Sequence, residues 1–324
     1  MRSERDKQLT SIGMMHPQCL WSIGLVLFLL TLFPLSSLAA PPIVTIIDDD
    51  TRNEQAIEAV KIIADRCKIK VTFAAIASNL EHNPKVADLL RSYEAEGHEL
   101  ASHSLTHRPD IWKAGTATDF NAIEREVYEA ENVFKHLELH PKSFVYPYGK
   151  FPSEVRQGIF EIVGKHYQVA FNARGDINLP GKTYPLYVSR HPLRKHNSMF
   201  MTKRLIDEAL AAGNSWVVIL THSGNADFSS EMLETIIRYA QKSGMVFLPA
   251  SAAWQQIKAW PMMSEDHIPD YTRFDDYANA VYFHLPLVLV TGFAIIVFCS
   301  CIIYVLARRR RTKLKAKEKA LSSC

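Results

Sequence analysis

The chain has 324 residues, of which 48% are hydrophobic and 22% are charged, and its formal net charge is +3. This composition is ordinary for a protein that buries a core, and it argues against intrinsic disorder. Eight bases and one acid lie beyond residue 307, so the rest of the chain carries a net charge of −4. That part gives no reason to expect a nucleic-acid partner.

The N-terminal region contains an apolar stretch from Leu20 to Leu38, followed by Ala39, Ala40 and Pro41. Small residues after an apolar run are typical of a secretory cleavage site, so residues 1–40 are predicted to be a signal peptide. The segment before the apolar run is long for a signal, and an uncleaved N-terminal anchor is the alternative. Either version exports the middle of the chain.

A second apolar stretch, residues 285–307, contains no formal charge. At about 1.5 Å per residue it is long enough to cross a bilayer core of about 30 Å, which predicts a transmembrane helix. Residues 308–324 are predicted to be a basic cytoplasmic tail, because positive flanks stay inside. The expected result is an extracytoplasmic catalytic domain over residues 41–260 and a juxtamembrane linker over residues 261–284. The protein would cross the membrane once, or twice if the N-terminal segment is retained.

Cys67 is the only cysteine expected in the exported part, so no internal disulfide can form there. It follows a helical pattern and is predicted to be a small packed hydrophobe.

Strand-like and helix-like segments alternate between residues 43 and 258. The expected strands are 43–47, 69–76, 98–101, 143–147, 167–171, 184–189, 216–221 and 245–248, and the expected helices are 52–66, 83–95, 118–138, 152–164, 202–212 and 229–243. Repeated strand-then-helix units predict a parallel sheet, and about seven of them predict an α/β fold of the distorted (β/α) barrel type. Gly97, Gly213 and Gly244 follow helical patterns, where a left-handed residue is wanted.

Polar residues follow three of the expected strands. They are the run Asp48-Asp49-Asp50, the pair His103 and His107, and His222. Because the carboxyl ends of parallel strands share one edge, these groups are predicted to meet at one rim of the sheet.

The residue types at this rim suit a metal ion. His103 and His107 have a spacing of four, which places two imidazoles close enough for one ion, and a carboxylate would complete the set. Strand alternation sends adjacent aspartates to different sides, so one can bind metal while another stays free as a base. The alternative for Asp49 or Asp50 is to cap the helix that begins near residue 52.

Four short motifs in order resemble the polysaccharide deacetylase family, which is also called the NodB-homology domain. They are Thr-Ile-Ile-Asp-Asp-Asp (45–50), Ser-His-Ser-Leu-Thr-His (102–107), Tyr-Pro-Tyr-Gly (146–149) and Ile-Leu-Thr-His (219–222), and the resemblance covers about residues 43–258.

This resemblance implies roles for individual residues. Asp48 matches the general base, and Asp49 matches the aspartate that binds the metal together with His103 and His107. Tyr148 matches the tyrosine whose backbone N–H helps hold the oxyanion. His222 matches the histidine that protonates the leaving amine.

Two departures from the family pattern leave alternatives open. The family usually has glycine after its two aspartates, where Asp50 stands here, so Asp49 and Asp50 could be the functional pair instead. The arginine that begins the third motif is replaced by Val145 and Tyr146. Arg190 is the candidate substitute that would orient the base, and a surface arginine is the alternative.

Other histidine and aromatic residues near the expected rim are predicted to lie outside the metal-ligand set. His191 and His196 are expected to be polar rim residues rather than ligands. Trp112, Tyr146 and Phe228 lie on expected loops, where they could stack on sugar faces, whereas Trp216 is expected in the core.

The function that follows is a membrane-anchored, metal-dependent polysaccharide N-deacetylase. Its partners would be an N-acylated amino-sugar polymer or a lipid-linked sugar, with no nucleic acid. A set of two histidines and one aspartate favours Zn²⁺ and also suits Co²⁺, Ni²⁺ or Fe²⁺. The main alternative is a catalytically silent carbohydrate-binding or assembly module of the same fold, and a weaker one is hydrolysis of an amide that is not on a sugar.

Overall fold

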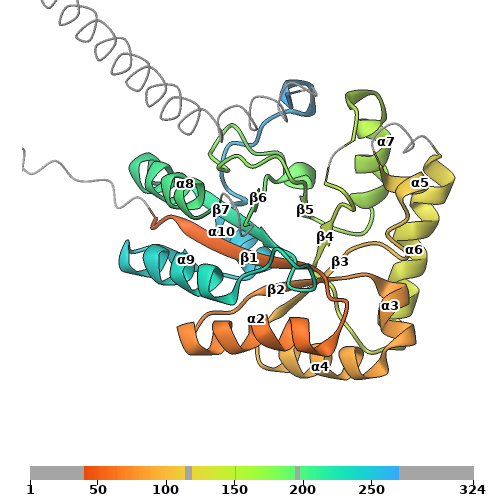
Figure 1. Cartoon of the computed structure of the whole chain (residues 1–324). Helices are drawn as coiled ribbons and strands as arrows, with labels where there is room; N and C mark the ends of the chain where they lie inside the picture. Colours follow the sequence, from red (N-terminus) through yellow and green to blue (C-terminus); the bar gives the residue numbers. More distant parts are fainter. Residues whose placement is uncertain (1–39, 114–118, 150, 194–197, 270–324) are drawn as a thin grey trace, which may run out of the picture. The chain divides into compact units, whose positions relative to one another are not determined.

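The computed structural model describes residues 40–113, 119–149, 151–193 and 198–269 (Figure 1). The predicted transmembrane helix, the basic tail and nearly all of the predicted signal peptide lie outside these residues. Within the described ranges, no helix is both long enough and apolar enough to cross a bilayer. The fold described below belongs to the compact unit that begins at Pro42.

A parallel sheet forms the centre of this unit, which confirms the predicted α/β class. Seven strands follow one another in the order β5-β4-β3-β2-β1-β7-β6, and β8 also pairs with β1. The strands are β1 (Ile43–Asp50), β2 (Thr72–Ala75), β3 (Glu99–Ser102), β4 (Ser143–Val145), β5 (Ala170–Phe171), β6 (His191–Pro192), β7 (Trp216–Thr221) and β8 (Val246–Phe247). All pairs between these strands are parallel.

The outer strands of the sheet, β5 and β6, are not joined to each other by a regular strand pair. Residues 184–189 were predicted to form a strand, and that prediction is wrong, because Pro185–Tyr187 is the short 3₁₀ helix η1. Proline has no N–H for a sheet ladder. Val188 makes one isolated bridge to Phe171 of β5, and the chain then joins β7 through β6. Among the described residues the sheet is therefore curled into an incompletely closed barrel.

Helices surround the outer side of the sheet (Figure 1). Neighbouring helices contact each other as a series from α8 through α9, α2, α4, α3 and α6 to α7. The long helices are α2 (Glu54–Cys67), α4 (Pro84–Ala95), α6 (Phe120–His136), α7 (Ser153–Val163), α8 (Ser198–Ala212) and α9 (Ser230–Lys242), all near their predicted positions. Three shorter helices were not predicted, namely α3 (Ala77–His82), α5 (Pro109–Trp112) and α10 (Ala250–Ile257).

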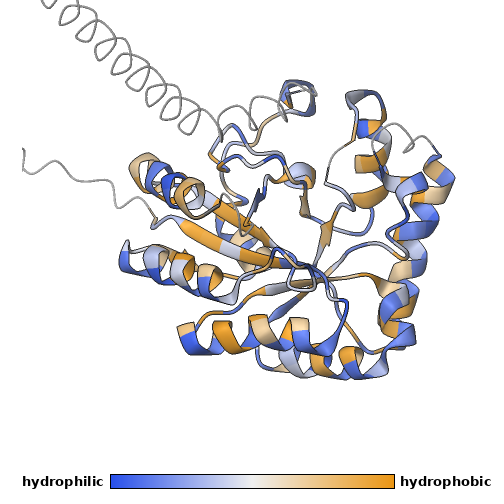
Figure 2. Ribbon diagram, in the orientation of Figure 1, coloured by the Kyte–Doolittle hydropathy of each residue, from blue (hydrophilic) through white to orange (hydrophobic). Residues whose placement is uncertain are grey.

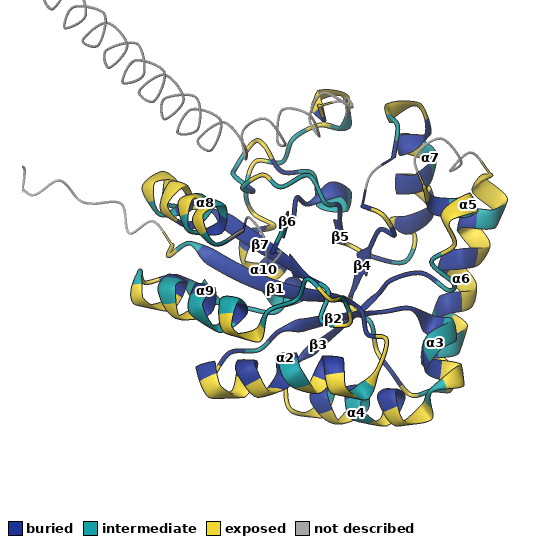
Figure 3. Cartoon of the chain, in the orientation of Figure 1, coloured by how far each residue is buried: buried dark blue, intermediate teal, exposed yellow. Residues whose placement is uncertain are grey.

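Alternation along β1 separates two parts of the core. Val44 and Ile46 belong to the cluster beneath the outer helices, whereas Ile43 and Ile47 belong to a second cluster with residues of α10. Hydrophobic segments in the middle of the molecule (Figure 2) coincide with buried strands (Figure 3), and the helices expose their outer sides. Because β1 is buried on both faces, the direction in which each of its side chains points decides which partner it meets.

The helix ends agree with the sequence patterns. Gly97, Gly213 and Gly244 have φ values of 92°, 75° and 83°, the left-handed region that was predicted for them. Cys67 is a buried free cysteine in the core, which confirms the prediction of a packed hydrophobe.

The last described residues pack against the body of the protein. Arg156 Nη1 donates to the Ile268 carbonyl at 3.0 Å, and Arg174 Nη1 donates to the Pro269 carbonyl at 2.6 Å. Ile268 is buried in the aromatic cluster that also contains Tyr187. The first part of the predicted linker is therefore held on the compact unit, and the linker beyond residue 269 stays a prediction.

His98 gives the fold a pH dependence. Its Nδ1 accepts the Val71 N–H at 3.3 Å, and burial, followed by the charges of Lys70 and Lys61, lowers the pKa of this ring from 6.5 to about 4. The folded protein therefore keeps His98 neutral where the unfolded chain binds a proton, so stability is full above pH 6.5 and is lost as the pH falls toward 4.

We expect the free energy of unfolding to fall by about 1–2 kcal/mol from this residue between pH 6.5 and pH 4, after allowance for screening by water. Urea unfolding of the wild type and of His98→Gln at several pH values measures the effect. An equally steep pH dependence in the variant would assign it to other groups.

Candidate active site

The predicted polar residues lie at the carboxyl end of the curled sheet. Asp48, Asp49 and Asp50 end β1, His103 follows β3, Tyr148 lies beyond β4, and His222 follows β7. The parallel pairing of β1 with β7 and β2, and of β2 with β3, brings these strand ends side by side. The structure therefore gathers the residues that the sequence predicted to meet.

Asp49 is held by the predicted arginine. It continues the face of Ile43 and Ile47, and its Oδ1 accepts a hydrogen bond from Arg190 Nη1 at 2.6 Å. Arg190 is 1% exposed, and its Nε donates to the Asn172 carbonyl at 2.8 Å. The alternative of a surface arginine is wrong. A buried, doubly anchored guanidinium fixes the orientation of the carboxylate.

Asp50 rather than Asp49 completes the group of three candidate metal ligands with His103 and His107. Its Oδ1 lies 3.5 Å from His103 Nε2 and 3.8 Å from His107 Nε2. Strict alternation would place Asp50 on the same side as Asp48, but its φ of 74° turns the chain out of the strand. Thr51 follows with φ 39°, so Thr51 adopts the conformation that favours glycine.

His103 is oriented as a metal ligand. It is 1% exposed, and its Nδ1 lies 2.8 Å from the Val145 carbonyl, which cannot donate. Nδ1 therefore carries the proton, and the lone pair of Nε2 faces Asp50. The Asp50 Oδ1 atom is buried, and no hydrogen-bond donor among the described residues serves it. A buried anionic oxygen that faces an imidazole lone pair is the arrangement that a cation would satisfy.

His107 completes the group from the following loop. Its ring centre lies 4.6 Å from that of His103. Burial lowers the pKa of His107 to about 4, so the ring is neutral at pH 7 and can offer a lone pair. Its φ of 56° is left-handed, so the loop must hold this strained residue in place.

Glu126 of α6, which sequence reasoning missed, anchors that loop. Its buried carboxylate accepts hydrogen bonds from the Thr106 N–H at 2.9 Å, from the Thr106 hydroxyl and from Trp112 Nε1 at 3.3 Å. Glu126 lies on the same helical face as the buried Ile123 and Val127. A lone carboxylate on an apolar helix face was the signal in the sequence.

We expect Glu126→Ala to weaken zinc binding by about 10- to 100-fold, the usual effect of losing support behind a metal ligand. Titration with a competing chelator measures the change. Glu124→Ala, an exposed residue of the same helix, is the matched control. Folded Glu126→Ala with wild-type zinc affinity would contradict this role.

Asp48 accepts hydrogen bonds from the residues on either side of His222. Its Oδ1 accepts the Thr221 hydroxyl at 2.7 Å and the Ser223 N–H at 2.8 Å, and its Oδ2 accepts the Ser223 hydroxyl at 2.5 Å. Burial raises the pKa of Asp48 to about 7, although the hydrogen bonds from Ser223 and Thr221 lower it. Asp48 thus binds both neighbours of His222 in the chain, and none of the three aspartates caps α2, whose cap is Asn53.

His222 and Tyr148 lie at the mouth of the site. The His222 Nε2 atom is 3.8 Å from Asp49 Oδ2, and its side chain is 31% exposed. Tyr148 has φ 61°, and its ring centre lies 4.7 Å from that of His107. In the described part of the chain, the Tyr148 N–H donates to no protein group, so it is free for a ligand.

Several predictions about aromatic and histidine residues are wrong. Trp112 and Tyr146 are 1% and 0% exposed and belong to the aromatic core cluster, so they cannot stack on a sugar. His191 is buried rather than on the rim. Phe228 is partly buried against the main core, and its contact with a sugar stays a prediction. Trp216 is in the core as predicted, and its Nε1 donates to Thr45. His196 lies outside the described residues.

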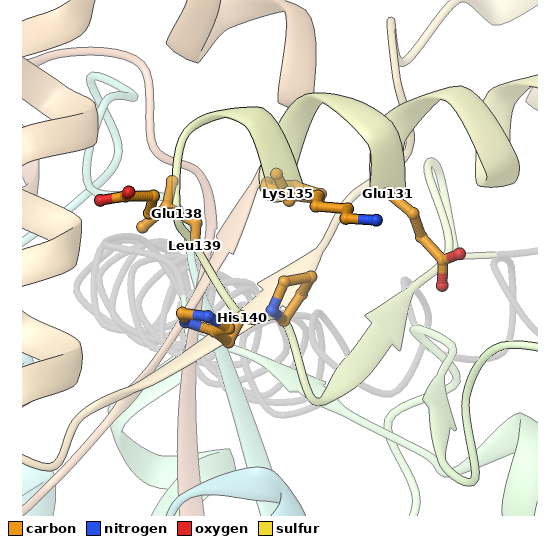
Figure 4. A pocket seen from close by; sticks show the side chains of 7 residues that line it. Glu131, Lys135, Glu138, Leu139 and His140 are labelled. Atoms are coloured by element: carbon orange, nitrogen blue, oxygen red, sulfur yellow. The ribbon is translucent and has the colours of Figure 1, made fainter.

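Two other features of the structure do not belong to this site. A cavity of about 270 Å³ is lined by residues 131–141 (Figure 4), which precede β4 and so lie toward the opposite end of the strand from Tyr148. Asp65, Glu96 and His98 form a second acidic group, but Lys61 Nζ lies 2.6 Å from Asp65 and 2.7 Å from Glu96. The ammonium group already supplies the positive charge there.

The fold and site define a parallel α/β protein with a candidate metal centre at the carboxyl end of its sheet, beside an aspartate–arginine pair. Residues 38–162 match the sequence model of the polysaccharide deacetylase family. The matched residues contain three of the four motifs that carry the resemblance, and the motif at 219–222 lies beyond them.

Two curated relatives carry the description chitooligosaccharide deacetylase. The protein from Rhizobium leguminosarum bv. trifolii is 35% identical over 81 residues, which are 25% of this chain and 34% of the relative. The protein from Sinorhizobium fredii (strain NBRC 101917 / NGR234) is 28% identical over 124 residues, which are 38% and 54% of the two chains. The chain thus spans about a third to a half of these relatives.

Among solved structures, the crystal structure of Puue allantoinase has a TM-score of 0.52 at 13% identity. The match covers 73% of this chain and 94% of that one. At this identity the likeness concerns the fold alone.

Proposed function

We propose that the chain is a membrane-anchored, metal-dependent deacetylase that hydrolyses the N-acetyl or a similar small acyl group of an amino sugar. The substrate would be a cell-envelope polysaccharide or a glycolipid. The observation that carries the proposal is the convergence of Asp50, His103 and His107 next to the Asp49–Arg190 pair. The polysaccharide deacetylase match and the chitooligosaccharide deacetylase relatives support the reaction type.

Asp50, His103 and His107 would hold the cation, with zinc favoured by two imidazoles and a carboxylate. When bound, a divalent ion supplies Lewis-acid polarisation of the acyl carbonyl and acidifies a water molecule. This assignment uses Asp49 and Asp50 as the functional pair, which is the second of the two registers that the sequence left open.

Asp49 takes the role of general base. Arg190 fixes the Asp49 carboxylate through Oδ1 and leaves Oδ2 unbonded among the described residues, so Oδ2 can take the proton of a water molecule beside it. His222, half-buried at the mouth, donates a proton to the leaving nitrogen, without which an amine is a poor leaving group. The Tyr148 N–H stabilises the negative charge that develops on the carbonyl oxygen. Asp48 positions His222 through Thr221 and Ser223.

Release of acetate tests the proposal. The full chain, solubilised in detergent and loaded with zinc, is incubated with N-acetylglucosamine oligomers and with peptidoglycan, and acetate is measured. We expect release that a chelator stops and added zinc restores. Stoichiometric zinc and tight saccharide binding without acetate release would favour the catalytically silent module.

Membrane anchoring is proposed from the sequence of residues 285–307 and the bases that follow. We expect the full chain to stay with membranes in alkaline carbonate and a chain that ends at residue 284 to be released. Recovery of both forms in the soluble fraction would reject the anchor.

A further inference from the structure

Arg52 contacts the candidate metal centre from the solvent side, and the proposed function does not use it. Its Nη2 lies 2.8 Å from Asp50 Oδ2, the oxygen of that carboxylate that does not face His103 and His107. Its side chain is 54% exposed, whereas Arg190, on the neighbouring aspartate, is buried. An ion pair whose cation is exposed to water contributes little to stability, so stability is a weak reason for this arrangement.

The backbone and the loop after β7 hold Arg52 over the mouth of the site. Two successive left-handed residues, Asp50 and Thr51, turn the chain there. A Cβ atom added to Gly224 would lie 3.6 Å from both Cβ and Cδ of Arg52, so the arginine stem runs along the loop that carries His222. The guanidinium charge also acts on Tyr148, since it opposes the rise in the pKa of that phenol caused by burial and by Asp50.

The charges at the rim leave Arg52 without a counterion of its own. Arg108 pairs with Asp110, Arg174 with Asp176, and Arg190 with Asp49. The acid that pairs with Arg52 is Asp50, which is also the candidate metal ligand. The remaining donors of the Arg52 guanidinium have no partner among the described residues. With a divalent ion bound, Arg52 and Arg190 balance Asp50 and Asp49, and the two charges of the ion exceed the single charge that Asp48 can carry. The mouth is therefore positive and attracts an anion.

We propose that Arg52 is a specificity residue that binds an oxyanion of the substrate, so that the preferred substrate is an acidic N-acylated saccharide. A planar guanidinium with free donors matches a carboxylate or a phosphate through paired hydrogen bonds. The group would lie on the acylated sugar or on its neighbour, within reach of the rim formed by Arg52 and Tyr148. This inference rests on the proposed function for the sugar, but its test does not require turnover.

Equilibrium binding tests the proposal. The full chain in detergent, loaded with zinc and carrying His222→Ala to suppress turnover, is titrated by calorimetry with two tetrasaccharides. One is neutral and contains only N-acetylglucosamine, and the other alternates N-acetylglucosamine with N-acetylmuramic acid, which carries a carboxylate. N-Acetylglucosamine and its 1-phosphate form the second pair, which distinguishes phosphate from carboxylate.

We expect the chain with Arg52 to bind one acidic ligand at least about tenfold more tightly than its neutral counterpart, with a preference that weakens as salt rises. Arg52→Gln should remove the preference and leave neutral binding within about twofold. Arg52→Lys should keep part of it, because charge remains and the paired geometry is lost. Arg108→Gln, an exposed arginine of the same rim, is the matched control and should change nothing.

Equal affinity for acidic and neutral ligands would overturn the proposal and leave the deacetylase function intact. So would an equal loss for both ligands with a loss of zinc in Arg52→Gln, because Arg52 would then only orient Asp50. Preference for the acidic ligand without acetate release by the wild type would uphold the role of Arg52 while rejecting the enzyme. Failure of all four saccharides to bind would reject both.

Discussion

Replacement of Asp49 by asparagine is expected to lower kcat/KM for acetate release by about 10²- to 10⁴-fold, whereas the same change at Asp48 should cost less than about tenfold. Asparagine at position 49 cannot accept a proton. At position 48 its amide oxygen can still accept the hydrogen bonds from Thr221 and the Ser223 N–H, so His222 keeps its position. Steady-state rates with an N-acetylglucosamine oligomer measure the difference.

The stability of each variant has to be followed in parallel. Loss of the Asp49 charge leaves a buried guanidinium at Arg190, which can cost about 3–5 kcal/mol, so rates are compared at a temperature well below both Tm values. Asp48→Ala provides a second comparison, because it removes all three hydrogen bonds that flank His222. An inactive Asp48→Asn and an active Asp49→Asn would restore the first register, with Asp48 as the base.

Zinc binding is expected to depend on Asp50 and not on the acidic group around Lys61. Asp50→Ala should weaken zinc binding by more than about 100-fold, since the loss of an outer-shell partner alone costs about 10- to 100-fold. His103→Ala should behave in the same way. Asp65→Ala, from the other acidic group, is the control and should keep wild-type affinity.

Metal analysis and thermal unfolding give two independent measurements of this effect. Zinc at 100 times its Kd should stabilise the wild type by about 2.7 kcal/mol and should leave Asp50→Ala almost unchanged. Removal of zinc with a chelator should abolish acetate release by the wild type. Retention of zinc by Asp50→Ala, together with its loss in Asp49→Ala, would show that Asp49 is the ligand.

The register of the aspartates explains why the sequence left two assignments open. Alternation along β1 correctly places the side chains of Asp48 and Asp49 on opposite faces of the sheet. It does not predict the residue at which the backbone leaves the extended conformation and alternation ends. The left-handed conformations of Asp50 and Thr51 occur where β1 ends. Non-glycine residues rarely adopt that region, so no local pattern predicts it.

Contacts between segments far apart in the sequence also explain the predictions of exposed residues that were wrong. Trp112 lies in a polar segment and Tyr146 precedes a turn-like Pro-Tyr-Gly sequence, so both look exposed. In the structure both belong to a buried cluster that includes residues of α6 and α7. Arg190 was found because a missing arginine needed a substitute. Its partner Asp49 lies 141 residues away in sequence, so the contact itself depends on the curled sheet.

The sequence by itself determined the parallel α/β class, most strand and helix positions, and the gathering of aspartates and histidines at one rim. These follow from local periodicity and from the rule that carboxyl ends of parallel strands share an edge. Only the tertiary structure decided that Asp50 joins His103 and His107, that Asp49 pairs with Arg190, and that Asp48 supports the His222 loop. Each of those outcomes depends on polar atoms that distant segments bring within 3.8 Å of one another, a proximity that sequence spacing does not encode.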